Sequence, residues 1–357
     1  MKFTVIRSND LTPEHLSVWS GIQEANPALA SPYFRPEFAM AAASVRDDVF
    51  IAVLEEGGKV VGFFPYQRRR FRIGKPVGGP LSDHHGVIAR IDADWRGDEL
   101  IRACGLSAWD FDHLIASQLP FQRYHTSRAK SPFMDLSRGF HAYATERIQA
   151  GSCVVTETRR KERKLEREVG RISFELDCSD DGVLRTLMRW KSGQYASSGL
   201  VDIFQFEWIV QFLQRLLVIK GEGFAGILSV LRAGDQIAAA HMGMRSRTVW
   251  HWWFPSYNRC LGQYSPGSIL LMKMAEAAPS LGIRAIDLGK GDSLYKQRLT
   301  SGAVEVAEGS VEASCVTSMA RRIRRGVEAW VRGSALAPVA RIPGRLLRRV
   351  ERRFRFQ

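Results

Sequence analysis

Long apolar runs and paired cysteines are what this sequence lacks. No segment approaches the roughly 20 consecutive apolar residues that a membrane-spanning helix needs, and the N-terminal stretch MKFTVIRSNDLTPE has no apolar signal-peptide core. The five cysteines are odd in number, widely spaced and without a Cys-x-x-Cys pair, which argues against a disulfide framework or a zinc site. We therefore expect a cytoplasmic protein with reduced thiols.

Acidic residues are scarce at the C-terminal end of the chain. Residues 318–357 contain twelve arginines but only two glutamates, so they carry +10 of the formal net charge of +14. Apolar residues recur there at helical spacing: Ile323, Val327 and Trp330, then Leu346, Val350 and Phe354. This pattern is typical of amphipathic helices at an anionic membrane surface, here the inner membrane. Nucleic-acid binding and a disordered tail are the alternatives.

The remaining sequence predicts two related halves. Two runs that resemble strand pairs, 49–67 and 224–245, each turn at glycine and each follow two predicted helices. We expect domains at 1–150 and 151–317, followed by the basic tail 318–357. The expected helices are 12–26, 35–45, 92–104, 156–169, 180–196 and 204–220; further strands are expected at 109–115, 171–176 and 283–288, and a loop at 122–138.

The stretch 248–296 is organised around a glycine-punctuated loop between an aromatic strand and a helix. Ser265 is suited to the N-cap position and Pro266 to the first helical position. Free amides at such a helix start can hold a phosphate or a developing oxyanion. The candidate binding residues of the loop are Gly262, Tyr264, Ser265, Pro266, Gly267 and Ser268.

The Ser-Pro-Gly loop, the strand end DLGKGD and the pair Tyr295-Lys296 resemble the GNAT acyltransferases, in particular their CelD-like branch linked to cellulose and exopolysaccharide synthesis. This branch is similar to the FemABX peptidyltransferases, which carry two such domains in one chain. The resemblance covers residues 152–311. One difference is that Arg259 is followed by CLGQYSPG and not by the usual x-x-Gly-x-Gly/Ala.

The resemblance implies an α/β (α+β) fold of two tandem GNAT-like domains, each a mixed, mainly antiparallel sheet flanked by helices. It also implies an enzyme that moves an acyl group from acyl-CoA, such as acetyl-CoA, to an amine or hydroxyl of a sugar, polysaccharide or envelope precursor by direct attack. The alternatives are a FemABX-like transferase that uses aminoacyl-tRNA and a non-catalytic accessory of a polysaccharide synthase.

The catalytic candidates are Asp287, Asp292, Tyr295, Lys296 and His241. A lysine at the Tyr-Lys pair could stabilise negative charge on the collapsing carbonyl, and a histidine is a base of near-neutral pKa. In the alternative interpretation the two aspartates cap the strand, the Tyr-Lys pair begins an ordinary helix, and His241 is a structural residue.

Two further segments are candidates for acceptor binding. Arg159, Arg160 and Arg163 belong to a basic helical stripe, which is either a solvated face or a site for an anionic ligand. Asp83 and His84 lie in a loop rich in glycine and proline that we expect to line the acceptor site. Neighbouring side chains on an extended segment point in opposite directions, so we expect no metal there.

Overall fold

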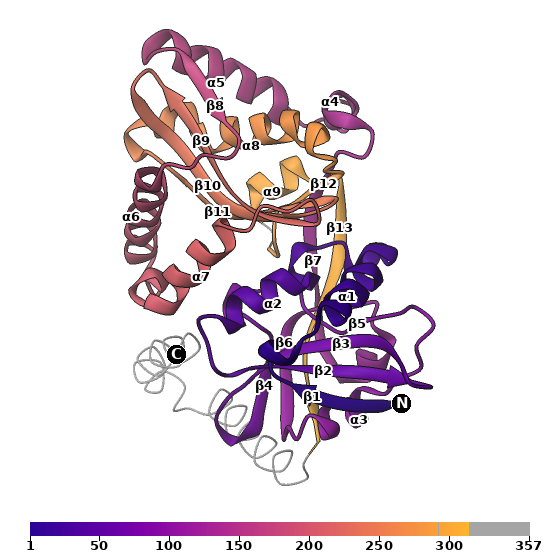
Figure 1. The fold of residues 1–357 in the computed structure, drawn as a ribbon. Coiled ribbons are helices and arrows are strands. Elements are labelled where there is room, and N and C mark those ends of the chain that lie inside the picture. The colour runs from indigo at the N-terminus through magenta and orange to yellow at the C-terminus, as the bar shows by residue number, and fades with distance from the viewer. Residues whose placement is uncertain (292, 314–357) are drawn as a thin grey trace, which may run out of the picture.

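The computed structural model describes residues 1–291 and 293–313, which form two lobes (Figure 1). The expectations for Asp292 and for the tail 318–357 therefore lie outside the described residues. No helix in the described ranges is long and apolar enough to cross a membrane.

The N-terminal lobe contains three α-helices and the first seven strands. Its helices are α1 (Pro13–Ala25), α2 (Pro36–Ala43) and α3 (Gly97–Ala103). Its strands are β1 (Lys2–Ile6), β2 (Val49–Glu56), β3 (Lys59–Arg68), β4 (Ile73–Lys75), β5 (Ile88–Ala89), β6 (Ala108–Ile115) and β7 (His125–Asp135). The described 3-10 turns of this lobe include η3 (Pro32–Phe34), η4 (Arg70–Arg72) and η5 (Gly79–Leu81).

The C-terminal lobe contains the remaining described elements. Its helices are α4 (Gly139–Gln149), α5 (Val154–Glu168), α6 (Asp181–Ser197), α7 (Glu207–Leu217), α8 (Pro266–Ala277) and α9 (Leu294–Leu299). Its strands are β8 (Ile172–Glu175), β9 (Phe224–Ala233), β10 (Gln236–Ser246), β11 (Val249–Tyr257), β12 (Ala285–Asp287) and β13 (Gly302–Glu312). A 3-10 turn, η8 (Arg259–Tyr264), precedes α8.

One sheet runs through both lobes, in the order β1-β2-β3-β4-β6-β13-β7-β12-β11-β10-β9-β8, with β5 beside β3. Most neighbours are antiparallel; β4 with β6 and β11 with β12 are parallel. Helices flank the sheet, so the expected α/β class with mixed, mainly antiparallel strands is confirmed (Figure 1). The domain limits 1–150, 151–317 and 318–357 stay predictions.

Local sequence signals explain many of these elements. The two glycine turns join β2 to β3 and β9 to β10 as antiparallel pairs, and Gly58 and Gly234 adopt positive φ angles of 78° and 55° that favour glycine. At the start of α1, the Thr12 side chain accepts a hydrogen bond from the His15 amide. The recurring hairpin predicted from the sequence is therefore present in both lobes.

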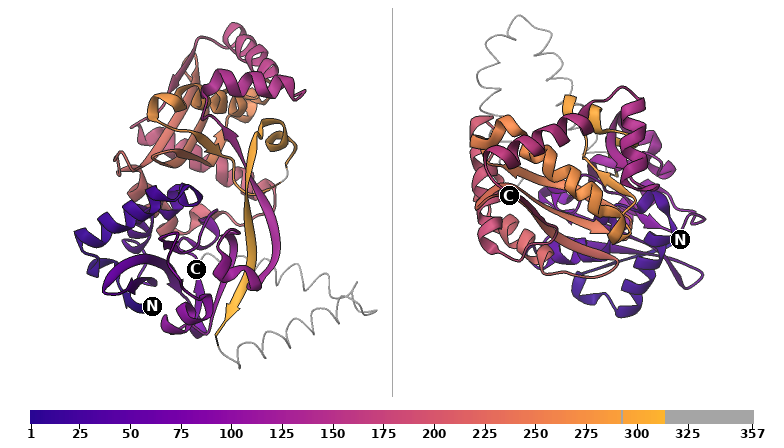
Figure 2. Two further views of the ribbon diagram at one scale, coloured as in Figure 1. Left: turned by 90° about the vertical axis from the view of Figure 1, so that its right-hand side faces the viewer. Right: turned by 90° about the horizontal axis from the view of Figure 1, so that it is seen from above.

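The predicted loop at 122–138 is wrong, because residues 125–135 form β7. The segment has few β-branched residues, so its strand pattern is weak. It forms a strand because it pairs with β13 on one side and with β12 on the other. The left view of Figure 2 shows β7 and β13 side by side, running from one lobe into the other. The helix expected at 92–104 begins later, at Gly97.

Apolar packing continues across the junction between the lobes. One buried cluster combines Tyr33 and Phe38 of the N-terminal lobe with Phe212 and Phe254 of the C-terminal lobe. The rings of Phe38 and Phe212 pack edge to face, with their centroids 5.3 Å apart. The lobes thus share a core, which holds the side chains at their junction in place.

Candidate functional site

The parallel strands β11 and β12 pair over only three residues. Their last paired residues are His251 and Asp287, after which β11 continues to Tyr257 while the chain leaves β12. We call this point the fork. It places a buried histidine beside a buried carboxylate at the position where the two strands stop pairing.

The segment after β11, residues 258–265, leads into α8 and includes η8. Ser265 occupies the N-cap position and Pro266 the first helical position, as predicted, although the Ser265 side chain makes no capping hydrogen bond. The residue has a left-handed backbone, with φ of 52°, in place of the extended backbone of an ordinary N-cap. Its Oγ instead accepts a hydrogen bond from Lys161 Nζ at 2.7 Å.

Space remains beside this helix start. A Cβ added to Gly262 or Gly267 would approach only the ring of Tyr257, at 3.8 and 3.7 Å. The buried Tyr264 donates its hydroxyl proton to Glu168 of α5 at 3.0 Å and is thereby fixed to that helix. The loop therefore presents glycine backbone, an aromatic ring and a lysine ammonium around the start of α8.

Helix α5 packs against α8. Its Arg159, Arg160 and Arg163 are exposed, while Lys161 points towards the loop and is half-buried. The three arginines predicted from the sequence thus lie on the solvent face of a helix whose neighbouring lysine reaches the loop. Whether they bind an acceptor stays a prediction.

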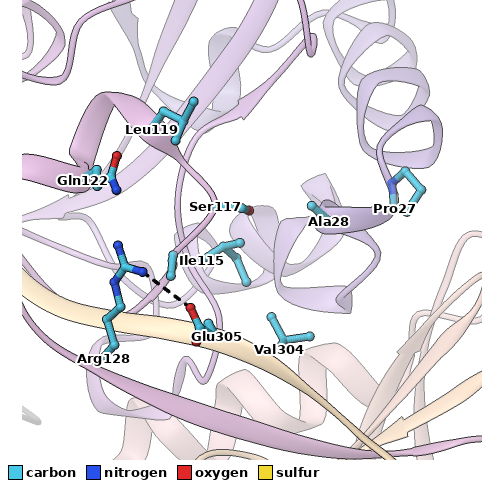
Figure 3. A pocket seen from close by; sticks show the side chains of 10 residues that line it. Pro27, Ala28, Ile115, Ser117, Leu119, Gln122, Arg128, Val304 and Glu305 are labelled. Carbon is cyan, nitrogen blue, oxygen red and sulfur yellow. Dashed lines mark ion pairs between the residues drawn. The ribbon is translucent and has the colours of Figure 1, made fainter.

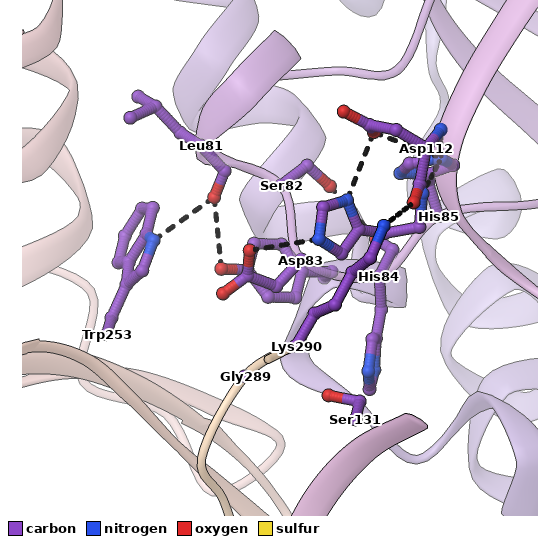
Figure 4. Close-up of polar contacts among 12 residues, drawn as sticks. Leu81, Ser82, Asp83, His84, His85, Asp112, Ser131, Trp253, Gly289 and Lys290 are labelled. Atoms are coloured by element: carbon purple, nitrogen blue, oxygen red, sulfur yellow. Dashed lines mark hydrogen bonds and ion pairs between the residues drawn. The ribbon is translucent and has the colours of Figure 1, made fainter. Parts of the chain in front are cut away.

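A chain of alternating carboxylates and imidazoles begins at the fork. His251 Nδ1 lies 3.4 Å from Asp287 Oδ2, and His251 Nε2 lies 2.9 Å from Asp83 Oδ2. The chain continues in the N-terminal lobe: Asp83 Oδ1 is 3.8 Å from His113 Nε2, and His113 Nδ1 is 3.1 Å from Asp112 Oδ1. Figure 4 shows Asp83 and Asp112 in this arrangement. We call these five residues the His–Asp chain.

The His–Asp chain runs from the protein interior towards the surface. The side chain of His251 is fully buried, that of Asp83 is 27% exposed and that of Asp112 is 43% exposed. The chain therefore connects a buried imidazole at the fork with a carboxylate at the surface. Lys290 contacts the surface end of the His–Asp chain: its Nζ donates a hydrogen bond to the Asp112 carbonyl oxygen at 3.0 Å (Figure 4).

The carboxylates of Asp287 and Asp83 control the charge of His251. Burial lowers the pKa of His251, but the carboxylates of Asp287 and Asp83 outweigh it and raise this pKa to about 9. Burial also opposes ionisation of Asp287, yet His84 and His251 hold the pKa of this carboxyl well below its usual range. His84 Nε2 lies 3.3 Å from Asp287 Oδ2. Burial lowers the pKa of His84, which favours its neutral form.

A tight turn after β12 presents Asp287. Its Oδ1 accepts from the Gly289 amide at 2.8 Å and from the Ser131 hydroxyl at 3.2 Å. Lys296 closes the turn by donating from Nζ to the carbonyl oxygens of Gly289 and Lys290, at 2.8 and 3.0 Å. Tyr295 is 46% exposed at the start of α9. The structure thus brings Asp287 and Lys296 together in one turn.

His241 lies outside the His–Asp chain. Its Nε2 accepts the Trp253 amide proton at 3.1 Å, and its ring stacks on Trp252 at 4.5 Å. Burial holds the pKa of His241 well below its ordinary value. This environment favours a neutral, fixed ring, and the catalytic role predicted for His241 stays a prediction.

The sequence alone did not single out several residues of the site. His113, Asp112, Lys161 and Lys191 carry no motif. Lys191 of α6 donates to the Pro255 carbonyl oxygen at 3.0 Å on the part of β11 beyond the fork, and burial lowers its pKa to about 8. His251 had one signal, its place in the aromatic strand. Asp83 and His84 lie at the lobe junction, and their place in the acceptor site stays a prediction.

A pocket in the described part of the chain lies away from the fork. It has a volume of about 340 Å³ and is lined by segments of the N-terminal lobe and by β7 and β13, including Leu119, Gln122, Arg128 and Glu305 (Figure 3). Arg128 of β7 and Glu305 of the neighbouring β13 form an ion pair of 3.6 Å in its lining. Within the described ranges, no group of three histidine, cysteine or acidic side chains is arranged to hold a metal ion.

Sequence comparison identifies the domain that contains the fork. Residues 154–297 match the acetyltransferase (GNAT) domain family. No curated protein matches the sequence.

Solved structures match the fold over nearly the whole chain. A tandem GNAT protein from the clavulanic acid biosynthesis pathway is 12% identical, with a TM-score of 0.51 over 88% of this chain and 98% of the other. FemX is 9% identical, with a TM-score of 0.55 over 90% of this chain and all of its own. Residues 154–297 therefore match a GNAT acetyltransferase domain, which supports an acyltransferase activity, and the fold of the chain is similar to that of a tandem GNAT protein.

Proposed function

We propose that this acyltransferase moves an acyl group from acyl-CoA, such as acetyl-CoA, to an amine or hydroxyl of a sugar, polysaccharide or envelope precursor. The observation that supports this reaction is the fork, where pairing of β11 and β12 ends at His251 and Asp287 beside Asp83 of the other lobe. The choice of acceptor rests on the resemblance of residues 152–311 to CelD-like proteins.

The residues around the start of α8 suit the diphosphate of CoA. First-turn amides and the positive end of a helix attract phosphate, and Lys161 adds a cation 2.7 Å from Ser265 Oγ. Gly262 and Gly267 keep side-chain bulk away from the Tyr257 ring. Tyr264 and Pro266 fix the loop, and Ser268 completes the first turn. Acyl-CoA would supply the activated thioester carbonyl.

Asp83 is the proposed first proton acceptor, because it is the partly exposed neighbour of the buried His251. As the acceptor nitrogen or oxygen bonds to the acyl carbon, its proton passes to the carboxylate of Asp83, which the protonated His251 holds through Nε2. The carbon–sulfur bond then breaks, and the thiolate that leaves takes up a proton to become a thiol. Asp287 stabilises the imidazolium from the other side.

Lys296 and Tyr295 complete the proposed active site. Lys296 fixes the turn that carries Asp287, and its charge favours an oxyanion near that turn. The roles of Tyr295, Asp292 and His241 rest on the family resemblance and on their positions in the sequence. Asp83 and His84 would position the acceptor, together with the exposed arginines of α5.

Titration calorimetry with CoA tests the donor site. We expect micromolar binding to the native protein and its loss in Gly267→Trp, which fills the space beside Tyr257. Gly193→Trp is the matched control, because Gly193 is an exposed helical glycine with open space around it. If CoA fails to bind the native protein, or if both variants bind it equally, the donor site is misplaced.

The alternative is a FemABX-like transferase that takes its acyl group from aminoacyl-tRNA. The likeness to FemX and the exposed Arg159, Arg160 and Arg163 favour this reading. Salt-sensitive tRNA binding that falls on Arg160→Gln, in a protein that does not bind CoA, would support it. CoA binding without transfer to any acceptor would instead fit a non-catalytic accessory of a polysaccharide synthase.

A further inference from the structure

The turn between β3 and β4 presents an aromatic side chain to solvent. Residues 68–72 read Arg-Arg-Arg-Phe-Arg, and the side chain of Phe71 is 81% exposed. We call these five residues the Phe71 turn. An isolated exposed apolar side chain is ordinary on a protein surface. Phe71 differs from such residues in its backbone conformation and in the charges around its ring.

The backbone holds Phe71 outward in a conformation that side chains disfavour. Phe71 and Arg72 both have left-handed φ angles, 58° and 54°, although neither is glycine. Hydrogen bonds maintain this shape: Ser107 Oγ donates to the Phe71 carbonyl oxygen at 2.6 Å, and the Ser107 amide donates to the Arg72 carbonyl oxygen at 2.9 Å. The fold therefore maintains a strained turn whose ring faces water.

Free positive charge surrounds the ring. Arg70 and Arg72 are exposed, and neither forms an ion pair with a residue of the described ranges. The Arg70 guanidinium lies 5.8 Å from the Phe71 ring. By contrast, Arg69 is paired with Asp48 at 3.3 Å. The exposed tip of the Phe71 turn therefore combines one aromatic ring with two cations.

The same end of the lobe is where the described chain ends. The amide of Ala313 donates to the carbonyl oxygen of Ser107 at 3.0 Å, and Ser107 is the residue that supports the Phe71 turn. Residues 318–357, with their net charge of +10, begin a few positions further along the sequence. The last described residue, Ala313, therefore lies beside the Phe71 turn.

We propose that the Phe71 turn is a docking point for an anionic lipid bilayer. Phe71 enters the interface between headgroups and acyl chains, while Arg70 and Arg72 bind lipid phosphates. Aromatic rings favour that interface, and each cation near an anionic leaflet adds to the attraction. A single ring on a projecting turn suits a planar interface, whereas single-stranded nucleic acid is bound in grooves with several stacking rings.

Vesicle binding by the full-length protein tests this docking point. Vesicles of phosphatidylcholine and phosphatidylglycerol are sedimented with native protein, Phe71→Gly or Phe71→Trp. Glycine suits the positive φ and removes the ring, so this variant should keep the fold. We expect Phe71→Gly to weaken binding by roughly tenfold and Phe71→Trp to retain it. The loss should persist at high salt, because burial of a ring is not screened.

Ile91→Gly is the matched control, because Ile91 is 89% exposed on the same lobe but lies between the paired Arg90 and Asp92. Its vesicle binding should be unchanged. Equal binding by Phe71→Gly and the native protein would overturn the proposal, as would an equal loss in Ile91→Gly. The double variant Arg70→Gln and Arg72→Gln separates the partners: reduced RNA binding with unchanged vesicle binding would assign the turn to nucleic acid.

Discussion

Gly289 illustrates how single residues fix the geometry of the fork. Its φ is 72°, and a Cβ there would lie 3.0 Å from Asp83 Oδ2. Gly289→Ala therefore adds left-handed strain and pushes on Asp83, and we expect a loss of about 1–2 kcal/mol in the free energy of unfolding. Chemical denaturation measures this change. Gly193→Ala, in the open part of α6, should instead be neutral or stabilising.

The pKa of His251 predicts how stability depends on pH. This pKa is about 9 in the folded protein and about 6.5 in the unfolded chain, so protonation of His251 favours the folded state. The contribution is complete below about pH 6.5 and disappears as the pH rises through 9. The shift corresponds to on the order of 3 kcal/mol. Unfolding of the native protein and of His251→Gln, followed from pH 6 to 10, should converge at the alkaline end.

If the difference in free energy of unfolding between the native protein and His251→Gln stays constant from pH 6 to 10, the positive charge is wrongly assigned to His251. The carboxylates act in the opposite direction: the pKa values of Asp83 and Asp287 are lowered by folding, so their contribution is lost only as the pH falls.

Lys296→Ala and Tyr295→Phe should each reduce turnover at least tenfold, which corresponds to about 1.4 kcal/mol of transition-state stabilisation. The ammonium of Lys296 donates hydrogen bonds to two carbonyl oxygens of the turn after β12, and the substitution by alanine removes both of them. Lys273→Ala is the control, since Lys273 pairs with Glu162 on the helices behind the sheet. Unchanged turnover in both site variants would leave the Tyr-Lys pair as an ordinary helix start.

At the scale of elements, Gly243 shows why β10 and β11 can approach beside the fork. A Cβ at Gly243 would lie 2.4 Å from both His241 Cε1 and the His251 carbonyl oxygen, and the register of the two strands shifts at this position. Gly243→Ala should therefore destabilise the protein by about 1–3 kcal/mol through overpacking. Thermal unfolding measures the loss, and Gly21→Ala in α1, where the space is open, should not show it.

Elements fixed by local rules could be predicted from the sequence, and elements fixed by neighbours could not. The hairpins β2–β3 and β9–β10 follow from glycine turns between strand-like runs. The polar β7 becomes a strand because β12 and β13 flank it, which no short window of sequence reveals.

The same distinction between local patterns and distant neighbours applies to the residues of the site. Asp83, His84 and Asp287 were identified because each lies in a loop or strand end with a recognisable pattern. His113 and Asp112 were missed because they become neighbours of Asp83 only when β6 meets a distant loop. Lys161 was missed because its partner, Ser265, is 104 positions away.

For the whole molecule, the separation of folded part and basic tail can be tested by truncation. Removal of residues 318–357 leaves every described strand intact and lowers the net charge from +14 to +4. We expect the truncated protein to fold and to lose most of its affinity for anionic vesicles. Any binding that remains should depend on Phe71. If the truncated protein fails to fold, the tail belongs to the C-terminal domain and the predicted limit at 317 is wrong.

The place of β13 has a consequence for biosynthesis. This strand lies between β6 and β7, yet residues 302–312 are translated long after both neighbours. On the ribosome, β6 and β7 therefore lack the strand that lies between them until residues 302–312 have been made. The exposed edges of β6 and β7 are open to wrong pairing during that time. A stalled nascent chain that ends before residue 302 should be more sensitive to protease at β6 and β7 than one that extends past 312.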